Sequence, residues 1–304
     1  MNCPLCGTSK SLIVRRSDLQ ELKKAWLHSF GFDPFSSDYA VKQIDKNRCA
    51  SCHLEFFDPP LYGDADFYAK LSKYPWYYEQ NKWEYDVAAE SVISLVPATL
   101  LEIGCGNGHF LDKIKPLGVD VEGVDINKDA VAACKSKELS VEAANVFDLK
   151  KSYDMVVLFE VLEHMEYVKE LFEFLTTKLI RPGGYLIIAV PNPDGYLKEL
   201  DINLLDMPPH HNSSWSLKCF EQLQTLYGLT LLEYKKEPLR YVHYHSYLQY
   251  VISSNANISM PTWKSRLFNK LQALLIRMLA PLTYLNSRER IDGQTHLVVL
   301  QNDR

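Results

Sequence analysis

Leu100-Leu101-Glu102-Ile103-Gly104-Cys105-Gly106-Asn107-Gly108 is the stretch that decides the fold of this 304-residue chain. Its first four residues predict a buried strand, and its glycines predict a tight turn before a helix that opens at His109. Glycine lets the backbone bend and lets a ligand approach main-chain N–H groups closely. Val124-Asp125 ends the next apolar strand, where an acid can bind both hydroxyls of a ribose. The stretch therefore predicts a nucleoside-binding corner.

Two details select the nucleoside. A dinucleotide fingerprint, G-x-G-x-x-G, requires glycine where this chain has His109. Glu102 closes the first strand, and a carboxylate there would repel a pyrophosphate but suits a ligand with an amino group. The strand, the turn and Asp125 together resemble the S-adenosylmethionine site of class I methyltransferases. The alternative is a glycine-rich turn that binds no ligand.

The resemblance implies a role for each matching residue. Glu102 would hold the methionine end, the glycine turn would pass beneath the cofactor, and Asp125 would bind the ribose. The full set of cofactor-binding candidates is Glu102, Gly104, Cys105, Gly106, Asn107, Gly108, Asp125, Ile126, Asn145, Val146 and Phe159. Many relatives have an acid at the adenine contact where this chain has Asn145, whose side-chain carbonyl can accept the same bond. The alternative for Asn145 is a loop polar residue.

Apolar strands and helices alternate from residue 86 onward. Continuous apolar strands separated by helices predict a parallel sheet covered on both faces. The expected strands are 99–103, 120–125, 140–144, 153–159, 185–190, 229–236 and 295–301. This pattern predicts an α/β fold, and seven strands match the Rossmann-like sheet of class I methyltransferases. The resemblance covers residues 86–236 and 291–304.

Two C-x-x-C pairs precede this region. Cys3 and Cys6 form one pair, Cys49 and Cys52 form the other, and 42 residues lie between them. Two such knuckles can complete a tetrahedral site of four thiolates. We expect residues 1–60 to form a zinc-ribbon-like module with a structural Zn²⁺ ion and one helix from Asp18 to Phe30. The alternatives are two unrelated cysteine pairs or a redox pair.

Two further segments have open interpretations. Residues 61–85 are rich in tyrosine and tryptophan, which favours a linker packed between domains, a wall over the cofactor or acceptor pocket, or both. Residues 237–290 interrupt the sheet before its last strand and contain an amphipathic stretch, 263–285, with basic residues and Trp263. That stretch fits packing on the domain, a dimer face, or contact with a membrane surface.

Phe159-Glu160-Val161-Leu162-Glu163-His164 follows the fourth strand at its carboxyl end, the edge where open α/β sheets bind ligands. A helical turn would bring Glu160, Glu163 and His164 together. The string resembles the E-V-L-E-H of quinone-biosynthesis O-methyltransferases and many sugar methyltransferases. It makes Glu160 and His164 candidate catalytic residues. The alternative is that Glu163 and His164 only cap a helix.

Pro208-Pro209-His210-His211 forms a second candidate acceptor element after the fifth strand. It looks like the P-x-H loop over the acceptor site of many class I enzymes that act on small molecules. An imidazole there can take the proton of an acceptor hydroxyl, since its pKa lies near neutrality. His211 is the first candidate for this base and His210 the second; the alternative is a histidine that only packs.

A metal site combines the two elements. Glu160, Glu163, His164 and His211 could together hold Mg²⁺ or Mn²⁺. The small-RNA 2′-O-methyltransferases use an E-x-x-E-H turn and a later histidine in this way. Such an ion would lower the pKa of the attacking hydroxyl.

Composition bounds the partners and the compartment. The net charge of −5 argues against a general nucleic-acid binder. No apolar run reaches the roughly eighteen residues of a membrane span. Met1-Asn2-Cys3-Pro4 has no signal-peptide features, and the seven cysteines fit reduced thiols, so we expect a cytoplasmic protein. Contact through 263–285 would place it peripherally at the inner face of the membrane.

The sequence predicts an S-adenosylmethionine-dependent methyltransferase that O-methylates a small hydroxylated acceptor. Cysteine pairs followed by an E-H turn and a P-P-H-H loop look similar to bacterial sugar and polysaccharide-associated methyltransferases, which implies a sugar or glycan-precursor acceptor. The alternatives are a metal-dependent RNA ribose 2′-O-methyltransferase and a non-catalytic, cofactor-binding docking protein. The acceptor, the atom methylated and the oligomeric state stay open.

Overall fold

The computed structural model describes residues 2–35, 41–196, 203–254 and 262–304, without the side chains of 249–250, 252–254 and 262–273. The chain folds into two compact units. The first comprises Met1–Pro191, Asn203–Lys235 and His296–Arg304, and the second comprises Asn192–Ile202 and Lys236–Thr295.

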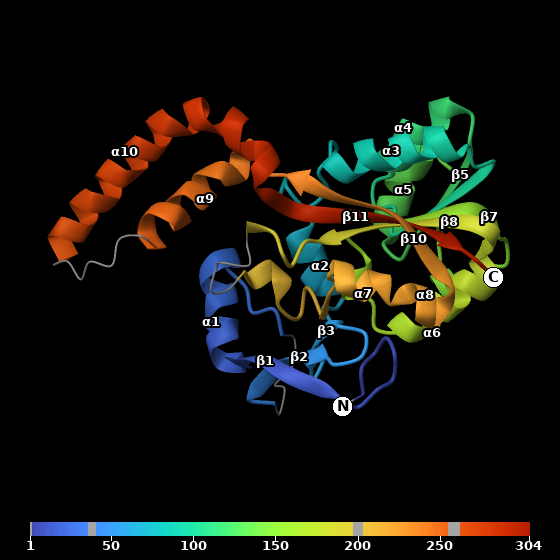
Figure 1. Ribbon diagram of the computed structural model, residues 1–304, viewed down its shortest axis with the longest axis horizontal. Coiled ribbons are helices and arrows are strands. Elements are labelled where there is room, and N and C mark those ends of the chain that lie inside the picture. Colours follow the sequence, from blue (N-terminus) through green and yellow to red (C-terminus); the bar gives the residue numbers. More distant parts are fainter. Residues whose placement is uncertain (1, 36–40, 197–202, 255–261) are drawn as a thin grey trace. The chain divides into compact units, whose positions relative to one another are not determined.

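A seven-stranded sheet forms the centre of the first unit, as predicted (Figure 1). Its strands lie in the order β10-β11-β8-β7-β4-β5-β6. The neighbours β4–β5, β4–β7, β5–β6 and β7–β8 pair in parallel. The strands are β4 (Thr99–Ile103), β5 (Asp120–Asp125), β6 (Val141–Ala143), β7 (Tyr153–Phe159), β8 (Ile180–Pro191), β10 (Leu229–Pro238) and β11 (Asp292–Asn302).

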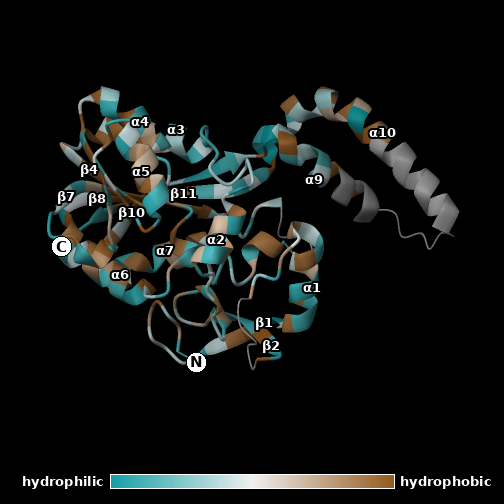
Figure 2. Ribbon diagram, turned by 180° about the vertical axis from the view of Figure 1, so that it is seen from behind, coloured by the Kyte–Doolittle hydropathy of each residue, from teal (hydrophilic) through white to brown (hydrophobic). Residues whose placement is uncertain are grey.

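Helices cover both faces of this sheet, because its strands are apolar on both faces (Figure 2). On β7, Met155 and Val157 join one buried cluster while Val156 and Leu158 join the other. The first cluster contains α3 (Trp83–Leu95), α4 (His109–Ile114) and α5 (Lys128–Ser136). The second contains α6 (Val168–Phe174), α7 (Leu217–Glu221) and α8 (Leu223–Tyr227).

The N-terminal residues form a second, four-stranded sheet with the order β1-β2-β3-β9. Its strands are β1 (Ser11–Asp18), β2 (Gln43–Cys49), β3 (Glu55–Asp58) and β9 (Ser213–Ser214). Helix α1 (Leu19–Phe30) lies between β1 and β2, and the Asp18 carboxylate caps it by accepting from the N–H groups of Gln20 and Glu21. Strand β9 comes from the segment that follows the predicted histidine loop, so this sheet is not built from residues 1–60 alone.

One strand start differs from the sequence expectation. The sequence predicts a strand over 185–190, but β8 begins at Ile180 and includes Arg181-Pro182-Gly183-Gly184. The register between β7 and β8 shifts between Tyr153 and Met155. The register shift lies beside Gly183 and Gly184, which are therefore part of β8. Before this strand, α6 passes into a π-helical turn over Leu175–Leu179.

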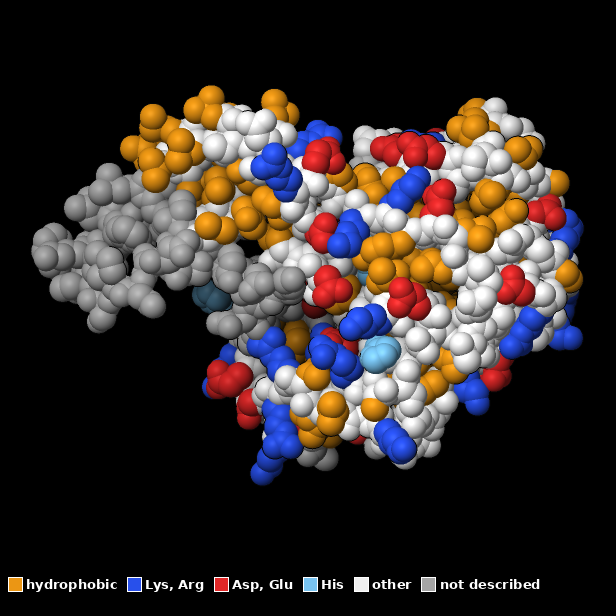
Figure 3. Space-filling view, in the orientation of Figure 1, with side chains coloured by type: hydrophobic (Ala, Val, Ile, Leu, Met, Phe, Trp, Pro, Cys, Tyr) orange, Lys and Arg blue, Asp and Glu red, His pale blue; other side chains and the backbone are white. Residues whose placement is uncertain are grey.

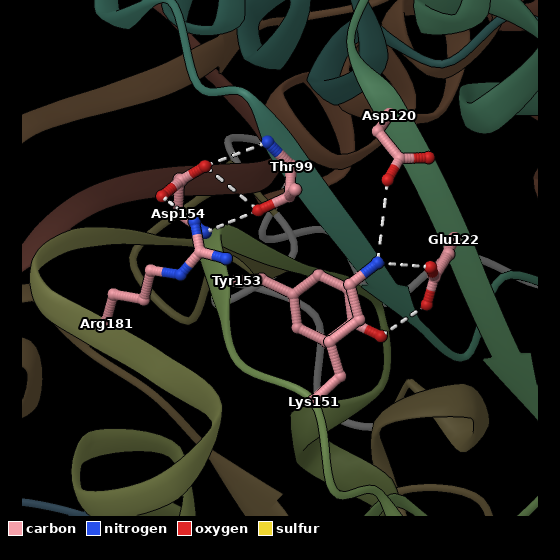
Figure 4. Close-up of polar contacts among 7 residues, drawn as sticks. All are labelled: Thr99, Asp120, Glu122, Lys151, Tyr153, Asp154 and Arg181. Atoms are coloured by element: carbon pink, nitrogen blue, oxygen red, sulfur yellow. Dashed lines mark hydrogen bonds and ion pairs between the residues drawn. The ribbon is translucent and has the colours of Figure 1, made fainter.

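Polar side chains join the amino ends of the central strands (Figure 4). The Asp154 carboxylate accepts from the backbone N–H and the hydroxyl of Thr99, both at 2.9 Å, and from Arg181 at 2.6 Å. Beside them, Glu122 accepts from the Tyr153 hydroxyl and from Lys151. These contacts tie β4, β5, β7 and β8 together at the edge opposite the glycine turn.

The second unit contains α9 (Tyr241–Ser254) and α10 (Thr262–Ser287). Tyr244 and Ala280 are buried between them, and the Tyr244 hydroxyl donates to Thr283 at 2.9 Å. The other face of α10 is exposed, and its hydrophobic side chains gather there (Figure 3): Leu274, Leu275, Met278, Leu279, Leu282 and Leu285. Among the described helices, none is both long and apolar enough to cross a membrane.

The remaining elements are short. They comprise α2 (Ala65–Leu71) and the 3₁₀ turns Lys115–Leu117, Val146–Asp148, Leu162–His164, Leu204–Asp206 and Arg288–Arg290. The turns Leu162–His164 and Leu204–Asp206 carry or flank the predicted histidines.

Candidate cofactor and acceptor sites

The glycine turn after β4 has the backbone that its sequence predicts. Gly104, Gly106 and Gly108 all have positive φ angles, of 73°, 49° and 72°. A Cβ atom on Gly104 would lie 2.4 Å from Val161, and one on Gly108 would lie 2.6 Å from Leu139. The turn therefore requires glycine for its conformation and for its packing.

Asp125 stands at the carboxyl end of β5 and joins this turn to the next loop. Its carboxylate accepts from the N–H of Gly106 at 2.8 Å and from the N–H of Asn127 at 2.7 Å. The neighbouring Ile126 is 81% exposed. A fixed carboxylate beside an exposed aliphatic side chain suits a ribose with a flat base next to it.

Glu102 is the buried acid at the end of β4. It is 1% exposed, and its Oε2 has no hydrogen-bond partner among the described residues. Burial raises its pKa well above the ordinary range, and the positive charge of Lys82 opposes that rise. An isolated buried carboxylate is unfavourable unless a cation or a donor reaches it. The ammonium group of S-adenosylmethionine is such a partner, so the residues fit this cofactor.

The other cofactor candidates differ in what they offer. Asn107 presents its carbonyl to Lys137 at 2.9 Å, and Cys105 and Phe159 are each 5% exposed. The Asn145 side chain is exposed and accepts from the N–H of Phe147 at 3.1 Å, so it caps a 3₁₀ turn. Val146 points into the core and is 6% exposed, which leaves only its backbone for a ligand.

The aromatic segment contacts both the glycine turn and the N-terminal residues. Tyr78 lies over the glycine turn, because a Cβ on Gly106 would be 3.1 Å from its ring, and its hydroxyl accepts from Asn127. Phe67 packs edge-to-face on Trp26 of α1, with ring centroids 5.4 Å apart. These contacts are compatible with both predicted roles, which stay predictions.

The E-V-L-E-H string is not a continuous helical turn. Glu160 has a φ of +54°, a left-handed conformation that is strained for a residue with a side chain. The 3₁₀ turn begins only at Leu162. The expected i, i+3, i+4 arrangement is therefore wrong for Glu160, although Glu163 and His164 do lie together.

The predicted histidines converge on Glu163. The Nε2 atoms of His164 and His211 each lie 3.8 Å from Glu163 Oε1. The His210 and His211 rings stack with centroids 4.3 Å apart, and each lies 4.8 Å from the His164 ring. The predicted divalent-ion set was Glu160, Glu163, His164 and His211. In the described residues, His164, His210 and His211 form the group whose nitrogens lie close enough for a metal ion.

Burial governs the charge in this cluster. It raises the pKa of Glu163 to about 7, against the effect of nearby His211. Burial lowers the pKa of His210 to about 3 and that of His164 well below its ordinary value, with help from the neighbouring imidazoles. His164 and His210 are therefore neutral at pH 7.

The four predicted zinc ligands also converge. Cys3 Sγ lies 3.5 Å from Cys52 Sγ, and Cys6 Sγ lies 3.6 Å from Cys49 Sγ. All four sulfur atoms lie within 4.8 Å of one another. Thiolates 2.3 Å from a tetrahedral Zn²⁺ are about 3.8 Å apart. The backbone N–H groups of Ser51 and Cys52 point at Cys49 Sγ at 3.4 Å, as a metal-bound thiolate requires. The donor set fits zinc.

The sequence motifs did not include three side chains that reach the site from other segments of the chain. Lys82 Nζ lies 3.6 Å from Glu84 Oε1, and Lys82 also faces the charges of Glu160 and Glu163. Asp206 Oδ1 lies 3.4 Å from His211 Nδ1, and the Tyr68 hydroxyl lies 3.3 Å from His164 Nδ1. None of them belongs to a spaced motif, so only the fold brings them together.

Residues 75–234 match the family described as "Methyltransferase domain". A "Probable S-adenosylmethionine-dependent methyltransferase" of Mycolicibacterium smegmatis is 31% identical over 102 residues, which cover 31% of this chain and 38% of that protein. A "Ubiquinone biosynthesis O-methyltransferase" of Alkalilimnicola ehrlichii is 30% identical over 129 residues, covering 38% and 52%. A solved "SAM dependent methyltransferase from Archaeoglobus fulgidus" is 20% identical, covers 71% of this chain and 94% of that one, and has a TM-score of 0.47.

The family match covers more than half of the chain, and the chain belongs to this family. Residues 75–234 are its methyltransferase domain. The chain spans only about two fifths to one half of the length of the two curated relatives.

Proposed function

We propose that this protein transfers a methyl group from S-adenosylmethionine to a hydroxyl of a small acceptor, of the sugar or glycan-precursor type. The observation that carries the proposal is the position of two residue sets at the carboxyl ends of neighbouring strands. Glu102 and Asp125 end β4 and β5, and the Glu163 cluster follows β7. Ligands of open α/β sheets bind at that edge.

The donor side is held by the residues that the resemblance implies. Glu102 receives the ammonium group, the glycine turn supplies close backbone, and Asp125 accepts from the ribose hydroxyls. Bound S-adenosylmethionine supplies an electrophilic methyl carbon whose bond to sulfur breaks, with the electron pair left on sulfur, as the acceptor oxygen forms the new bond. Alignment and proton removal are the remaining tasks of the chain.

His211 is the proposed proton acceptor, with His210 as second candidate. Asp206 faces His211 Nδ1 and orients the ring, so that Nε2 is free to take the acceptor proton. His164 and Glu160 complete the acceptor side, where His164 is fixed by the His210 carbonyl. This arrangement supports O-methylation, in which the lost proton needs a base.

Calorimetry with S-adenosylhomocysteine tests the donor side. Asp125→Ala should weaken binding at least tenfold, about 1.4 kcal/mol, because the ribose loses its acceptor. The control is Asp129→Ala, an exposed acid in the first turn of α5, which should bind as the wild type does. Wild-type protein that binds no S-adenosylhomocysteine would contradict the proposal.

An acceptor panel tests the other side. It contains sugars, nucleotide sugars and small phenols, together with RNA ribose in the presence of Mg²⁺ or Mn²⁺. The proposal is supported if the wild type methylates a small hydroxyl compound and if His211→Gln lowers that turnover about a hundredfold. Turnover only on RNA, abolished by chelators, would favour the ribose methyltransferase, and no turnover on any acceptor would favour a docking protein.

We also propose that Cys3, Cys6, Cys49 and Cys52 hold a structural Zn²⁺ ion. The sulfur spacing and the two N–H groups aimed at Cys49 support it. Metal analysis should find one zinc per chain that Cys49→Ser removes. A Cys49→Ser protein with unchanged zinc and fold would refute the site.

The exposed apolar face of α10 supports peripheral contact with an anionic membrane, since Arg277 is exposed beside it. Flotation with anionic liposomes tests this contact. Leu282→Glu should abolish flotation, and wild-type protein that stays at the bottom of the gradient would refute it.

A further inference from the structure

We propose that His164, His210 and His211 bind a divalent transition-metal ion beside Glu163, on the acceptor side of the site. The three residues come from two segments, the turn after β7 and the loop before β9. Each offers one ring nitrogen, and these nitrogens lie within 4.8 Å of one another. Three imidazoles with one open position form the ligand set of many catalytic zinc sites.

Oxygen atoms outside the cluster orient each ring. His210 Nδ1 lies 2.8 Å from the Leu205 carbonyl, and His164 Nδ1 lies 2.5 Å from the His210 carbonyl. A carbonyl only accepts, so both Nδ1 atoms carry the proton and donate it. Asp206 holds His211 Nδ1 in the same way. In the neutral rings of His164 and His210 the Nε2 atom is thereby the unprotonated one, which is the arrangement that supports a metal ligand.

Glu163 provides an independent observation. Its side chain is 1% exposed, and neither carboxylate oxygen has a hydrogen bond among the described residues. The nearest Nε2 atoms, at 3.8 Å, are beyond hydrogen-bond distance. Nitrogen and oxygen ligands of one tetrahedral ion are about 3.3 Å apart. The 3.8 Å separation therefore places Glu163 beside the imidazoles and not among the ligands, and the charge of a cation held by the three rings would offset that of the buried carboxylate.

The ligand chemistry identifies the class of ion. Imidazole nitrogen suits Zn²⁺, Fe²⁺, Ni²⁺ and Cu²⁺, whereas Mg²⁺ prefers oxygen. This three-histidine site differs from the Mg²⁺ or Mn²⁺ site predicted from the sequence. Its ligands include His210 in place of Glu160, and its metal is one that prefers nitrogen.

The ion would act on the acceptor, and this role rests on the proposed function. It lowers the pKa of a hydroxyl at the open position. With its Nε2 on the metal, His211 could not be the base proposed above for the metal-free protein, and the adjacent Glu163 carboxylate would take the acceptor proton in its place. The hydroxyl oxygen then forms its bond to the methyl carbon as the carbon–sulfur bond breaks, so charge and atoms balance.

Metal analysis tests the site on the full-length protein. Wild-type protein and variants are stripped with a mild chelator, reloaded with Zn²⁺, desalted and measured by mass spectrometry. Two zinc ions per chain are expected for the wild type and for His28→Ala, which changes an exposed histidine on α1. His210→Ala and His164→Asn should hold one. Reloading with Co²⁺ distinguishes the two sites by their absorption spectra. The thiolate charge-transfer band of the four-cysteine site should remain in His210→Ala and in His164→Asn. The visible bands of the imidazole site should be absent from both variants.

Each outcome decides the matter. One zinc per wild-type chain, lost in Cys49→Ser and unchanged in His210→Ala, overturns the imidazole site. If His210→Ala fails to fold by circular dichroism, His164→Asn carries the test. S-adenosylhomocysteine binding is measured on the same samples. Retained binding with a single zinc overturns only the metal inference, and absent binding overturns the proposed function.

Discussion

At the scale of single residues, the glycine turn combines two requirements that the sequence does not separate. Gly108 has a left-handed backbone, and a Cβ there would meet Leu139 at 2.6 Å and Cys134 at 2.8 Å. Gly118 is also left-handed, but nothing lies within 4 Å of its Cβ position. A comparison of substitutions at Gly108 and Gly118 therefore distinguishes the effect of backbone strain from the effect of close packing.

Gly108→Ala should destabilise the protein more than Gly118→Ala. A side chain in the left-handed region costs about 1 kcal/mol, and overpacking adds about 1 to 3 kcal/mol at Gly108 only. Urea unfolding of both variants measures the difference. Equal losses of stability would mean that Leu139 and Cys134 move aside freely.

Residue spacing predicted the places of Glu102 and Asp125 in the fold better than it predicted the surroundings of Glu163. The positions of Glu102 and Asp125 could be predicted because each lies at the carboxyl end of an apolar strand that the sequence itself predicts. Lys82 and Asp206 approach the site from segments far along the chain, and no local pattern reports such contacts. Glu160 was misplaced because its left-handed backbone breaks the helical spacing that the string suggests.

At the scale of elements, fully buried apolar strands were predictable from the sequence, and exposed or very short strands were not. β7 is an unbroken apolar run that is buried on both faces. β1 leaves Leu12, Ile13 and Val14 exposed, so its pattern gives no clear burial signal. β9 has only two residues and exists because β3 lies beside it.

The polar cluster at the amino ends of the strands predicts a pH-dependent stability. Burial raises the pKa of Asp154, but hydrogen bonds from Arg181 and Thr99 outweigh it and hold the pKa below the ordinary value. A carboxylate with a lowered native pKa stabilises the fold above its unfolded pKa of about 3.9, and this contribution is lost as pH falls through the native value. Asp154→Asn should therefore lose about 1 to 2 kcal/mol at pH 7.

The loss should shrink as pH falls below about 4, because the wild-type carboxyl then becomes neutral as well. Asp120→Asn is the control, since its exposed carboxylate only pairs with Lys151 at 3.5 Å and should change stability by less than about 0.5 kcal/mol. Denaturant unfolding at pH 7 and pH 3.5 checks both. A constant difference across pH would show that packing, and not the charge of Asp154, causes the effect.

At the scale of the first unit, the N-terminal residues hold the histidine loop in place. β3 pairs with β9, directly after the loop. The Asn212 side chain donates to the Leu61 carbonyl and accepts from the Leu61 N–H, both at 2.9 Å. The backbone N–H of Asn212 donates to the Glu163 carbonyl at 2.9 Å. A continuous series of hydrogen bonds thus links the cysteine-bearing sheet to Glu163, through Phe57 and Asn212.

This link predicts that the cysteine site acts on the acceptor side and spares the donor side. Cys49 ends β2, which pairs with β3, so Cys49→Ser should remove the zinc and loosen β3, β9 and the loop between Met207 and Ser214. Hydrogen exchange should rise in that loop and stay unchanged in β4 and β5, while S-adenosylhomocysteine affinity changes less than about threefold. Ser51→Ala changes an exposed residue between Cys49 and Cys52. This control should keep its zinc, and hydrogen exchange in the loop should stay as slow as in the wild type. Zinc loss without faster exchange in the loop would mean that β3 and β9 are held by the shared core alone, because Phe56 and Trp215 are buried in it.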